Sequence, residues 1–367
     1  MSLGNNAEMM VTLRDLKQHA IRSSLFPATT LGRAVNRMGF VQADPIRSPA
    51  RAQDLILRHR VTDYKVGDLE RRYRNLKLEE DYLYAYGFMP LATWKLLHPR
   101  GQRALSDTEQ RVLDIVSKSR HIHPRELEAH LGRSREINGW GGYSKATTRS
   151  LEKLHYLGLI RIAGRVNGIK LYEKAAGLVH EAESPEERLR QLVLMIAGIL
   201  APVPESSLRG ALLHLRRATG DLPGRKSALG KLLKAGELDV AEVDGVRYLW
   251  PAGRLKRGEP EEAVCFLAPF DPVVWDRRRF EHFWNWAYRF EAYTPPAKRK
   301  LGYYAMPLLW REDVIGWVNV SGRGISGRSG EVMIDAGYVK GKPPAEKAFH
   351  CAFEEEMERM LRFLLPE

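Results

Sequence analysis

Three consecutive segments of this 367-residue chain repeat one order of elements: an amphipathic helix, further helical stretches, and a short strand–turn–strand pair. Helices followed by a β-hairpin are the outline of a winged helix, a helix-turn-helix with a hairpin appended. The repetition predicts an α+β fold, mainly α, made of tandem winged-helix domains. The predicted domains are 1–104, 105–180 and 181–258, followed by a C-terminal region, 259–367, that contains a β-hairpin and a closing helix.

The second and third segments carry the clearest local signals. Ser184 followed by Pro185 is typical of a helix N-cap with proline at the first helical position. Asn167-Gly168 and Asp244-Gly245 each lie between two strand-like stretches and are typical hairpin turns. The ranges predicted from these patterns are helices 107–119, 145–157, 184–200, 204–215 and 224–235, a short helix from residue 123, and strands 159–164, 169–173, 238–243 and 247–250.

The first segment and the C-terminal region follow different patterns. In the first segment we expect helices 12–24, 30–38, 66–73 and 93–97 and a short strand after residue 38. In the C-terminal region we expect strands 264–267, 303–309, 314–320 and 332–336 and a helix over 345–365. A run of strands closed by one helix sets this region apart from the three segments before it.

The charge balance indicates a polyanionic partner. Lys and Arg number 58 against 45 Asp and Glu, which gives a formal net charge of +13 and a pI near 9.7. An excess of this size favours a polyanion, and nucleic acid is the default partner. No apolar run is long enough to span a bilayer and no signal-peptide core is present, so we expect no membrane partner.

The chain contains two cysteines, Cys265 and Cys351, which form neither a disulfide framework nor a zinc-binding pattern. We expect both to be buried as small apolar residues in a reducing compartment. With the basic charge, this predicts a cytoplasmic, nucleoid-associated protein. We expect it to be a monomer.

A polar pair stands out in the short strand of the first segment. Gln42 and Asp44 are two residues apart, so on an extended segment both side chains lie on one face. A carboxylate beside an amide, followed by Arg47 and Arg51, can activate a water molecule near an anion. An equally good interpretation of these residues alone is that Asp44 caps the turn that follows the strand.

The stretch Gln42-Ala43-Asp44 resembles the Gln-x-Asp motif of the AlkZ/YcaQ-type winged-helix DNA glycosylases, which excise alkylated purines and unhook interstrand crosslinks. Stretches 267–277 and 288–304 resemble the same family in the same order, and the similarity runs from about residue 12 to the C-terminus. The resemblance implies a monofunctional DNA N-glycosylase, a hydrolase that acts on double-stranded DNA with alkylated purine lesions and needs no metal or other cofactor.

The resemblance also implies Gln42 and Asp44 as the catalytic residues, since both match the family motif. Hydrolysis of an N-glycosidic bond passes through an oxocarbenium-like sugar. Asp44 would stabilise that cation and take a proton from the attacking water, while Gln42 would hold the water or the sugar. The candidates for DNA binding are Arg47, Arg51, Lys298, Arg299, Lys300 and Tyr303.

Two places depart from the family pattern. Many members carry a His within a Trp-Ala-His-Glu-like stretch where this chain has Tyr84, and an Arg-x-Asp-x-Lys pattern where it has Trp317, Asn319 and Ser321. These positions bear on which lesions are accepted and on activity itself. Two other classes stay open: a non-catalytic winged-helix DNA-binding or regulatory protein, indifferent to Asp44, and a metal-dependent nuclease, for which no carboxylate cluster at metal-ligand spacing stands out.

Overall fold

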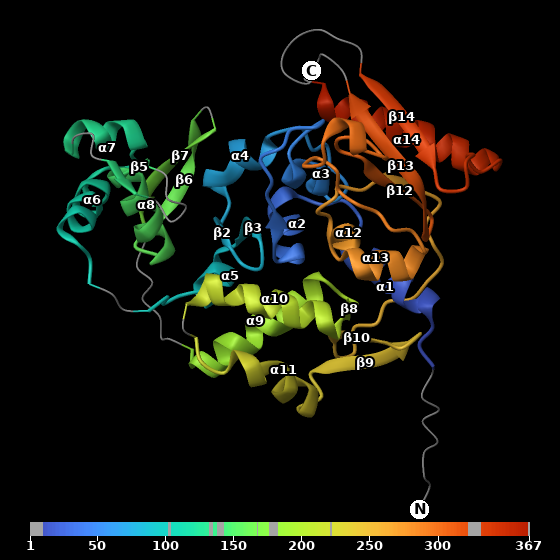
Figure 1. The fold of residues 1–367 in the computed structure, drawn as a ribbon, viewed down its shortest axis with the longest axis horizontal. Helices are drawn as coiled ribbons and strands as arrows, with labels where there is room; N and C mark the ends of the chain where they lie inside the picture. Colours follow the sequence, from blue (N-terminus) through green and yellow to red (C-terminus); the bar gives the residue numbers. More distant parts are fainter. Residues whose placement is uncertain are drawn as a thin grey trace, which may run out of the picture.

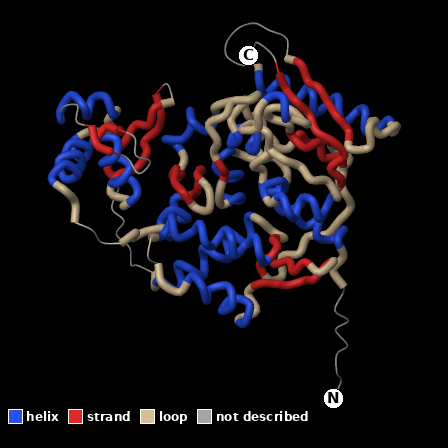
Figure 2. The backbone as a smooth tube through the Cα atoms, viewed as in Figure 1, coloured by secondary structure: helices blue, strands red, loops and turns tan. Residues whose placement is uncertain are grey.

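A computed structural model describes residues 10–101, 104–131, 135–137, 143–166, 168–175, 183–220, 222–321 and 332–365, with backbone alone at 135–137 and 143–145. Figure 1 shows the first segment near the centre, the second to its left, the third below, and the C-terminal strands and last helix at the upper right. Over the described ranges helices predominate, and the strands form several small antiparallel sheets (Figure 2). This confirms an α+β fold that is mainly helical.

The first segment opens with two helices, α1 (Leu13–Ser24) and α2 (Leu31–Met38), and α2 ends at Gly39 in the left-handed conformation (φ 71°). The chain then forms a three-stranded sheet in the order β1-β3-β2. The remaining elements of this segment are β1 (Val41–Gln42), α3 (Ala52–Leu57), α4 (Asp68–Arg72), the 3₁₀ helix η1 (Tyr73–Asn75), β2 (Leu78–Tyr82), β3 (Tyr86–Pro90) and α5 (Leu91–Leu96).

Two features of this segment differ from the sequence prediction. Strand β1 is only two residues long, so Asp44 lies beyond its end rather than within it. Neither α3 nor the β2–β3 hairpin is predicted from the sequence, and β2 carries three consecutive acidic residues. Their carboxylates are buried: Glu79, Glu80 and Asp81 are each at most 4% exposed.

The second segment has its own apolar core and matches the predicted helices and strands closely. It comprises α6 (Asp107–Lys118), α7 (Pro124–Leu131), β4 (Arg135–Ile137), β5 (Tyr143–Lys145), α8 (Ala146–Tyr156), β6 (Ile160–Val166) and β7 (Ile169–Lys174). Its core includes Val112, Leu127, Leu154 and Ile162. The hairpin β6–β7 faces α4 and β2 of the first segment (Figure 1).

The third segment also follows the prediction. It comprises α9 (Pro185–Ile199), β8 (Val203–Pro204), α10 (Glu205–Thr219), α11 (Arg225–Lys234), β9 (Leu238–Val243) and β10 (Val246–Pro251), with the sheet order β8-β10-β9. The Ser184 hydroxyl accepts the N–H of Glu187 at 3.2 Å, as expected of an N-cap. Asp244 (φ 51°) and Gly245 (φ 73°) form the predicted hairpin turn.

The C-terminal region is a four-stranded sheet packed against one long helix. The strands β11 (Val264–Phe266), β12 (Met306–Trp310), β13 (Asp313–Ser321) and β14 (Met333–Tyr338) lie in that order, and α14 (Lys347–Leu364) packs on β11. Between β11 and β12 are α12 (Pro272–Trp275), α13 (Arg277–Trp284) and η2 (Pro296–Lys298). The prediction of two buried cysteines is wrong, because Cys265 is partly buried and Cys351 is exposed on α14.

The first segment and the C-terminal region share one apolar core and two buried ion pairs. Arg60 and Asp271, both fully buried, are 2.9 Å apart. Glu356 of α14 is paired with Arg58 and also accepts the N–H of Phe266 at 2.9 Å. Ala43 packs at the edge of this core, which brings the Gln42–Asp44 pair against the C-terminal region.

Candidate active site

The position of Gln42 and Asp44 is set by the pairing of β1 with β3. Val41 lies opposite Phe88 and Gln42 opposite Gly87, and the N–H of Ala43 donates to the carbonyl of Tyr86 at 2.9 Å. Only glycine fits at position 87, since a Cβ there would lie 2.3 Å from the carbonyl oxygen of Val41. After Ala43 the chain leaves the sheet, and Asp44 stands at that exit.

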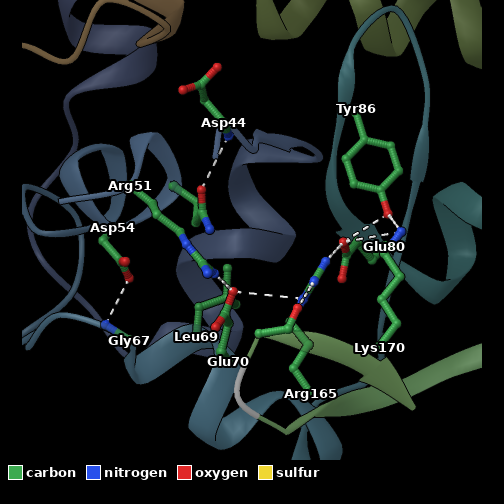
Figure 3. Close-up of polar contacts among 12 residues, drawn as sticks. Asp44, Arg51, Asp54, Gly67, Leu69, Glu70, Glu80, Tyr86, Arg165 and Lys170 are labelled. Atoms are coloured by element: carbon green, nitrogen blue, oxygen red, sulfur yellow. Dashed lines mark hydrogen bonds and ion pairs between the residues drawn. The ribbon is translucent and has the colours of Figure 1, made fainter. Parts of the chain in front are cut away.

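Asp44 is a partly buried carboxylate without a cationic partner among the residues that the structure describes. Its Oδ1 accepts the N–H of Ile46 at 2.9 Å, and its own N–H donates to Oε1 of Gln53 at 3.4 Å. Burial raises the pKa of the Asp44 carboxyl, and the bond from Ile46 offsets part of that rise. Figure 3 shows the carboxylate pointing away from the ion pairs that surround Arg51.

These contacts bear on both interpretations of Asp44. The bond from Ile46 is the turn-capping contact expected of an Asp in a purely structural role. It occupies only Oδ1, and Oδ2 has no hydrogen-bond partner in the described part of the chain. One oxygen therefore holds the turn, while the other is free to contact a ligand.

Gln42, two residues before Asp44, contributes an unsatisfied polar atom. Its Oε1 is buried and has no hydrogen-bond partner among the described residues. An acceptor left in that state costs on the order of 1–3 kcal/mol, so such atoms are rare unless a water or ligand completes them. The amide is therefore available to bind a molecule beside Asp44.

A tyrosine that the sequence interpretation did not place at this site lies close to Asp44. Tyr304, just before β12, is 2% exposed, and its hydroxyl has no hydrogen-bond partner in the described ranges. Burial and then the negative charge of Asp44 raise the pKa of this hydroxyl. The only sequence signal for Tyr304 is its place in the stretch 288–304, which the fold brings against the Gln42–Asp44 pair.

The two arginines that follow Asp44 in the sequence have different surroundings. Arg47 is exposed and forms no ion pair within the described residues. The Arg51 guanidinium is paired with Glu70 of α4, and its side chain is 16% exposed. Arg51 is thus largely held inside the protein.

Arg51 belongs to a continuous group of charges between the first and second segments (Figure 3). Glu70 also lies 3.8 Å from Arg165 of β6, and Arg165 is paired with Glu80 of β2. Lys170 of β7 lies 3.9 Å from Glu80 and also contacts the Tyr86 hydroxyl, which donates to Glu80 at 2.8 Å. We call this group, Arg51, Glu70, Glu80, Tyr86, Arg165 and Lys170, the junction cluster.

The basic run at residues 298–300 is presented on a well-held loop. Lys298 and Lys300 are exposed, and the Arg299 guanidinium lies 4.9 Å from the centre of the Tyr303 ring, itself 41% exposed. Although burial opposes it, three backbone N–H groups, of Lys300, Leu301 and Gly302, hold the pKa of the Glu291 carboxyl below its usual value. The loop is thereby fixed around a buried carboxylate.

Ring contacts connect this loop with the Asp44 site. Phe290 lies 5.1 Å from Tyr304, measured between ring centres, and 6.2 Å from the exposed Tyr293. The charge of Asp44, after burial, contributes to the raised pKa of the Tyr304 hydroxyl, so the two side chains interact electrostatically. The stretch 288–304 therefore runs from the candidate catalytic carboxylate to a basic and aromatic surface.

Comparison with known proteins agrees with this arrangement. The profile of the family described as "DNA glycosylase AlkZ-like" matches residues 35–363. The chain belongs to the AlkZ-like DNA glycosylase family. Its structure is similar to that of Streptomyces sahachiroi DNA glycosylase AlkZ, with a TM-score of 0.64 and 13% identity over 96% of this chain and 97% of that one.

The departures from the AlkZ-like pattern have structural explanations in this chain. Tyr84 is buried and its ring lies 5.0 Å from Phe40 and 5.1 Å from Trp275, so it fills the interior. The Asn319 side chain donates to the carbonyl of Leu301 at 2.8 Å and thereby helps to hold the basic loop in place. Trp317 stacks on Trp286 at 5.8 Å. Ser321 is exposed at the end of β13.

Two further features bear on chemistry and location. Across the described ranges, no three His, Cys, Asp or Glu side chains stand together where they could hold a metal ion. In the same ranges, no helix combines the length and apolar character that crossing a membrane requires.

Proposed function

We propose that this AlkZ-like protein is a monofunctional DNA glycosylase that hydrolyses the N-glycosidic bond of alkylated purines in double-stranded DNA, with interstrand crosslinks as a further substrate. The observation that carries the proposal is the carboxylate of Asp44. It is partly buried, has no cationic partner in the described chain and keeps Oδ2 free, and Gln42, two residues before it, has an unsatisfied amide oxygen.

This arrangement suits the chemistry of N-glycosidic hydrolysis. As the bond breaks, positive charge develops on the sugar, and a nearby carboxylate that is not already neutralised by Arg or Lys can stabilise it. The raised pKa makes Asp44 a stronger base toward the attacking water than an ordinary exposed aspartate. The free Oε1 of Gln42 can accept a hydrogen bond from the same water.

Because the site contains few polar groups, it favours a damaged base that can leave without protonation by a general acid. A purine alkylated at N7 or N3 is already cationic, so its departure needs no protonation by a general acid. Tyr304, the buried hydroxyl near Asp44, would then position water or sugar rather than protonate the base, because its pKa is raised. This supports alkylated purines over neutral, undamaged bases as the substrate class.

DNA would be held by the basic surface and by the repeated helix–hairpin segments. Lys298, Lys300 and the Arg299–Tyr303 pair offer phosphate contacts and an aromatic ring on one fixed loop. The helix order of the second and third segments, each followed by a hairpin, supports the winged-helix interpretation and the predicted boundaries near residues 104, 180 and 258. We extend the same interpretation to the first segment.

A base-release assay tests the proposal directly. The protein in excess is incubated with duplex DNA that carries one N7-methylguanine, and the free base and the abasic site are both quantified. Undamaged duplex and the Asp44→Asn variant are the controls, and Gln42→Ala should lose less than Asp44→Asn because solvent can partly replace an orienting amide. Tight binding of both duplexes without any base release would instead favour the non-catalytic DNA-binding alternative.

A further inference from the structure

A cavity open to solvent lies apart from the Asp44 site. It has a volume of about 710 Å³ and is lined by α1 and α2, by α9 and by the chain after β10, whose positions Figure 1 shows. Its lining includes neither Gln42, Asp44 nor Tyr304. The volume is within the range of about 300–1,000 Å³ that is typical of small-molecule sites.

Three of the side chains that line the cavity are cations without carboxylate partners, although the Lys256 ammonium donates to the carbonyl of Arg22 at 3.3 Å. They are Arg37, Arg254 and Lys256, and none of the three has a carboxylate within ion-pair distance among the residues described. Burial and the charges of Arg37, Arg22 and Arg254 lower the pKa of Lys256, so these cations are close together. Such a group is stabilised when an anion occupies the space between its members.

The acidic and polar groups nearby do not neutralise these cations. Glu237 also lines the cavity, but it is engaged by Arg190 at 2.5 Å. His19 accepts the backbone N–H of Lys256 on Nδ1 at 3.2 Å, and burial, reinforced by Lys256, lowers its pKa to about 4. His19 is therefore neutral near pH 7 and does not offset the charges of Arg37, Arg254 and Lys256.

Apolar side chains also line the cavity. They are Met38, Leu194, Met195 and Ile199, and a Cβ on Gly39 would lie 3.6 Å from both Met195 and Ile199. Methionine side chains adapt to flat organic groups and make favourable contacts with aromatic rings. The lining thus combines apolar side chains suited to a nucleobase with cations suited to a phosphate.

We propose that this cavity binds the phosphate of a nucleotide, supplied either by a free mononucleotide or by a nucleotide of bound DNA. The base would lie against the methionines, and Arg37, Arg254 and Lys256 would contact the phosphate. The proposal is independent of the catalytic role of Asp44, because no residue of that site lines the cavity.

Calorimetric titration of the full chain with AMP, adenosine and inorganic phosphate tests the first source, and fluorescence anisotropy with undamaged duplex DNA tests the second. The double variant Arg37→Gln with Lys256→Gln removes two of the three cations. Arg33→Gln is the matched control, since Arg33 is exposed on the same helix and does not line the cavity. Asn36→Trp narrows the cavity from an exposed lining position and leaves its charges intact.

If the nucleotide is free, the parent binds AMP at least about tenfold more tightly than adenosine. The double variant and Asn36→Trp each lower the affinity for AMP at least about tenfold. If the phosphate comes from DNA, AMP is inert and the double variant weakens duplex binding by a similar factor. In both cases Arg33→Gln stays within about twofold. Asp44→Asn should bind AMP as the parent does, which separates this test from that of catalysis. Equal affinities of the double variant and the parent for both AMP and duplex would overturn the proposal.

Discussion

Two carboxylates of the first segment, those of Glu80 and Asp44, have opposite electrostatic surroundings. Glu80 of β2 is buried and contacts Arg165, Lys170 and the Tyr86 hydroxyl. Asp44, just beyond strand β1 of the same sheet, is partly buried; its carboxylate has one backbone hydrogen bond and no cation among the described residues. Figure 3 shows both within one view.

The difference separates a structural carboxylate from a chemically available one. The charge of Glu80 is already used to hold Arg165 and Lys170, so little of it is left for a ligand. The charge of Asp44 is not neutralised within the protein, and burial makes its ionised form less stable, as the raised pKa shows. In a chain with net charge +13, a carboxylate without an Arg or Lys partner is the less expected of the two.

The largest expected effect is on catalysis at Asp44. Asp44→Asn keeps the size of the side chain and an oxygen that can accept the Ile46 N–H, but it removes the negative charge. Single-turnover base release should fall by roughly 10²–10⁴-fold, the usual value of a positioned acid–base group, while duplex binding stays intact. A structural role alone predicts normal base release in this variant and a stability loss of about 1 kcal/mol only in Asp44→Ala.

The next effect is on stability at Glu80. Glu80→Gln leaves Arg165 and Lys170 without their shared carboxylate, so we expect the free energy of unfolding to fall by about 1–3 kcal/mol. Glu70→Gln is the matched control, since that carboxylate is 24% exposed and should cost less. Urea denaturation measures both. A loss of base release in folded Glu80→Gln as large as in Asp44→Asn would remove the distinction between the two carboxylates.

A smaller effect is expected on DNA affinity at the basic loop. Replacement of Lys298, Arg299 and Lys300 by Ala should weaken binding about tenfold, equally for damaged and undamaged duplex, because phosphate contacts carry no lesion information. The slope of log affinity against log salt should become shallower by up to about 3. Anisotropy titrations at several salt concentrations measure both quantities. An unchanged slope would show that this loop does not contact phosphates.

The smallest effect concerns the pH dependence of base release. Because the pKa of Asp44 is raised, the reactive carboxylate is lost by protonation at a higher pH than for an ordinary aspartate. The rate should therefore be full at neutral pH and fall as the pH decreases, with a midpoint above about 3.9. Single-turnover rates across pH, with folding followed by circular dichroism, measure this midpoint. The residual base release by Asp44→Asn should not show this decrease at low pH.

Local signals in the sequence predicted the helices and hairpins well, and long-range charge pairing explains where they did not. Ser184 and the Asp244-Gly245 turn act through contacts within a few residues, so they could be identified from the sequence. The acidic strand β2 could not, because its burial depends on Arg161 and Arg165, about eighty residues away. Such pairing leaves no periodic pattern to detect.

The candidate site likewise contains residues that the sequence identifies and residues that only the structure reveals. The family resemblance of the Gln-x-Asp motif is enough to single out Gln42 and Asp44. It does not reveal that Tyr304 interacts with Asp44, because the two come together only through the shared core of the first segment and the C-terminal region. Nor does it show that Arg51 is held by Glu70, which lies in a helix with no obvious relation to the motif.

The junction cluster has a consequence for the cooperativity of the molecule. The second segment has a core of its own, and charged side chains supply much of its contact with the first segment. Units joined in this way open at a lower free energy than that of global unfolding, and the chain as a whole departs from two-state behaviour. Amide hydrogen exchange should therefore show α6–α8 and β6–β7 as one protected unit that separates from a still-folded remainder. Under the proposed function, displacement of this segment would let a bulky DNA adduct enter without disturbing the core that holds Asp44.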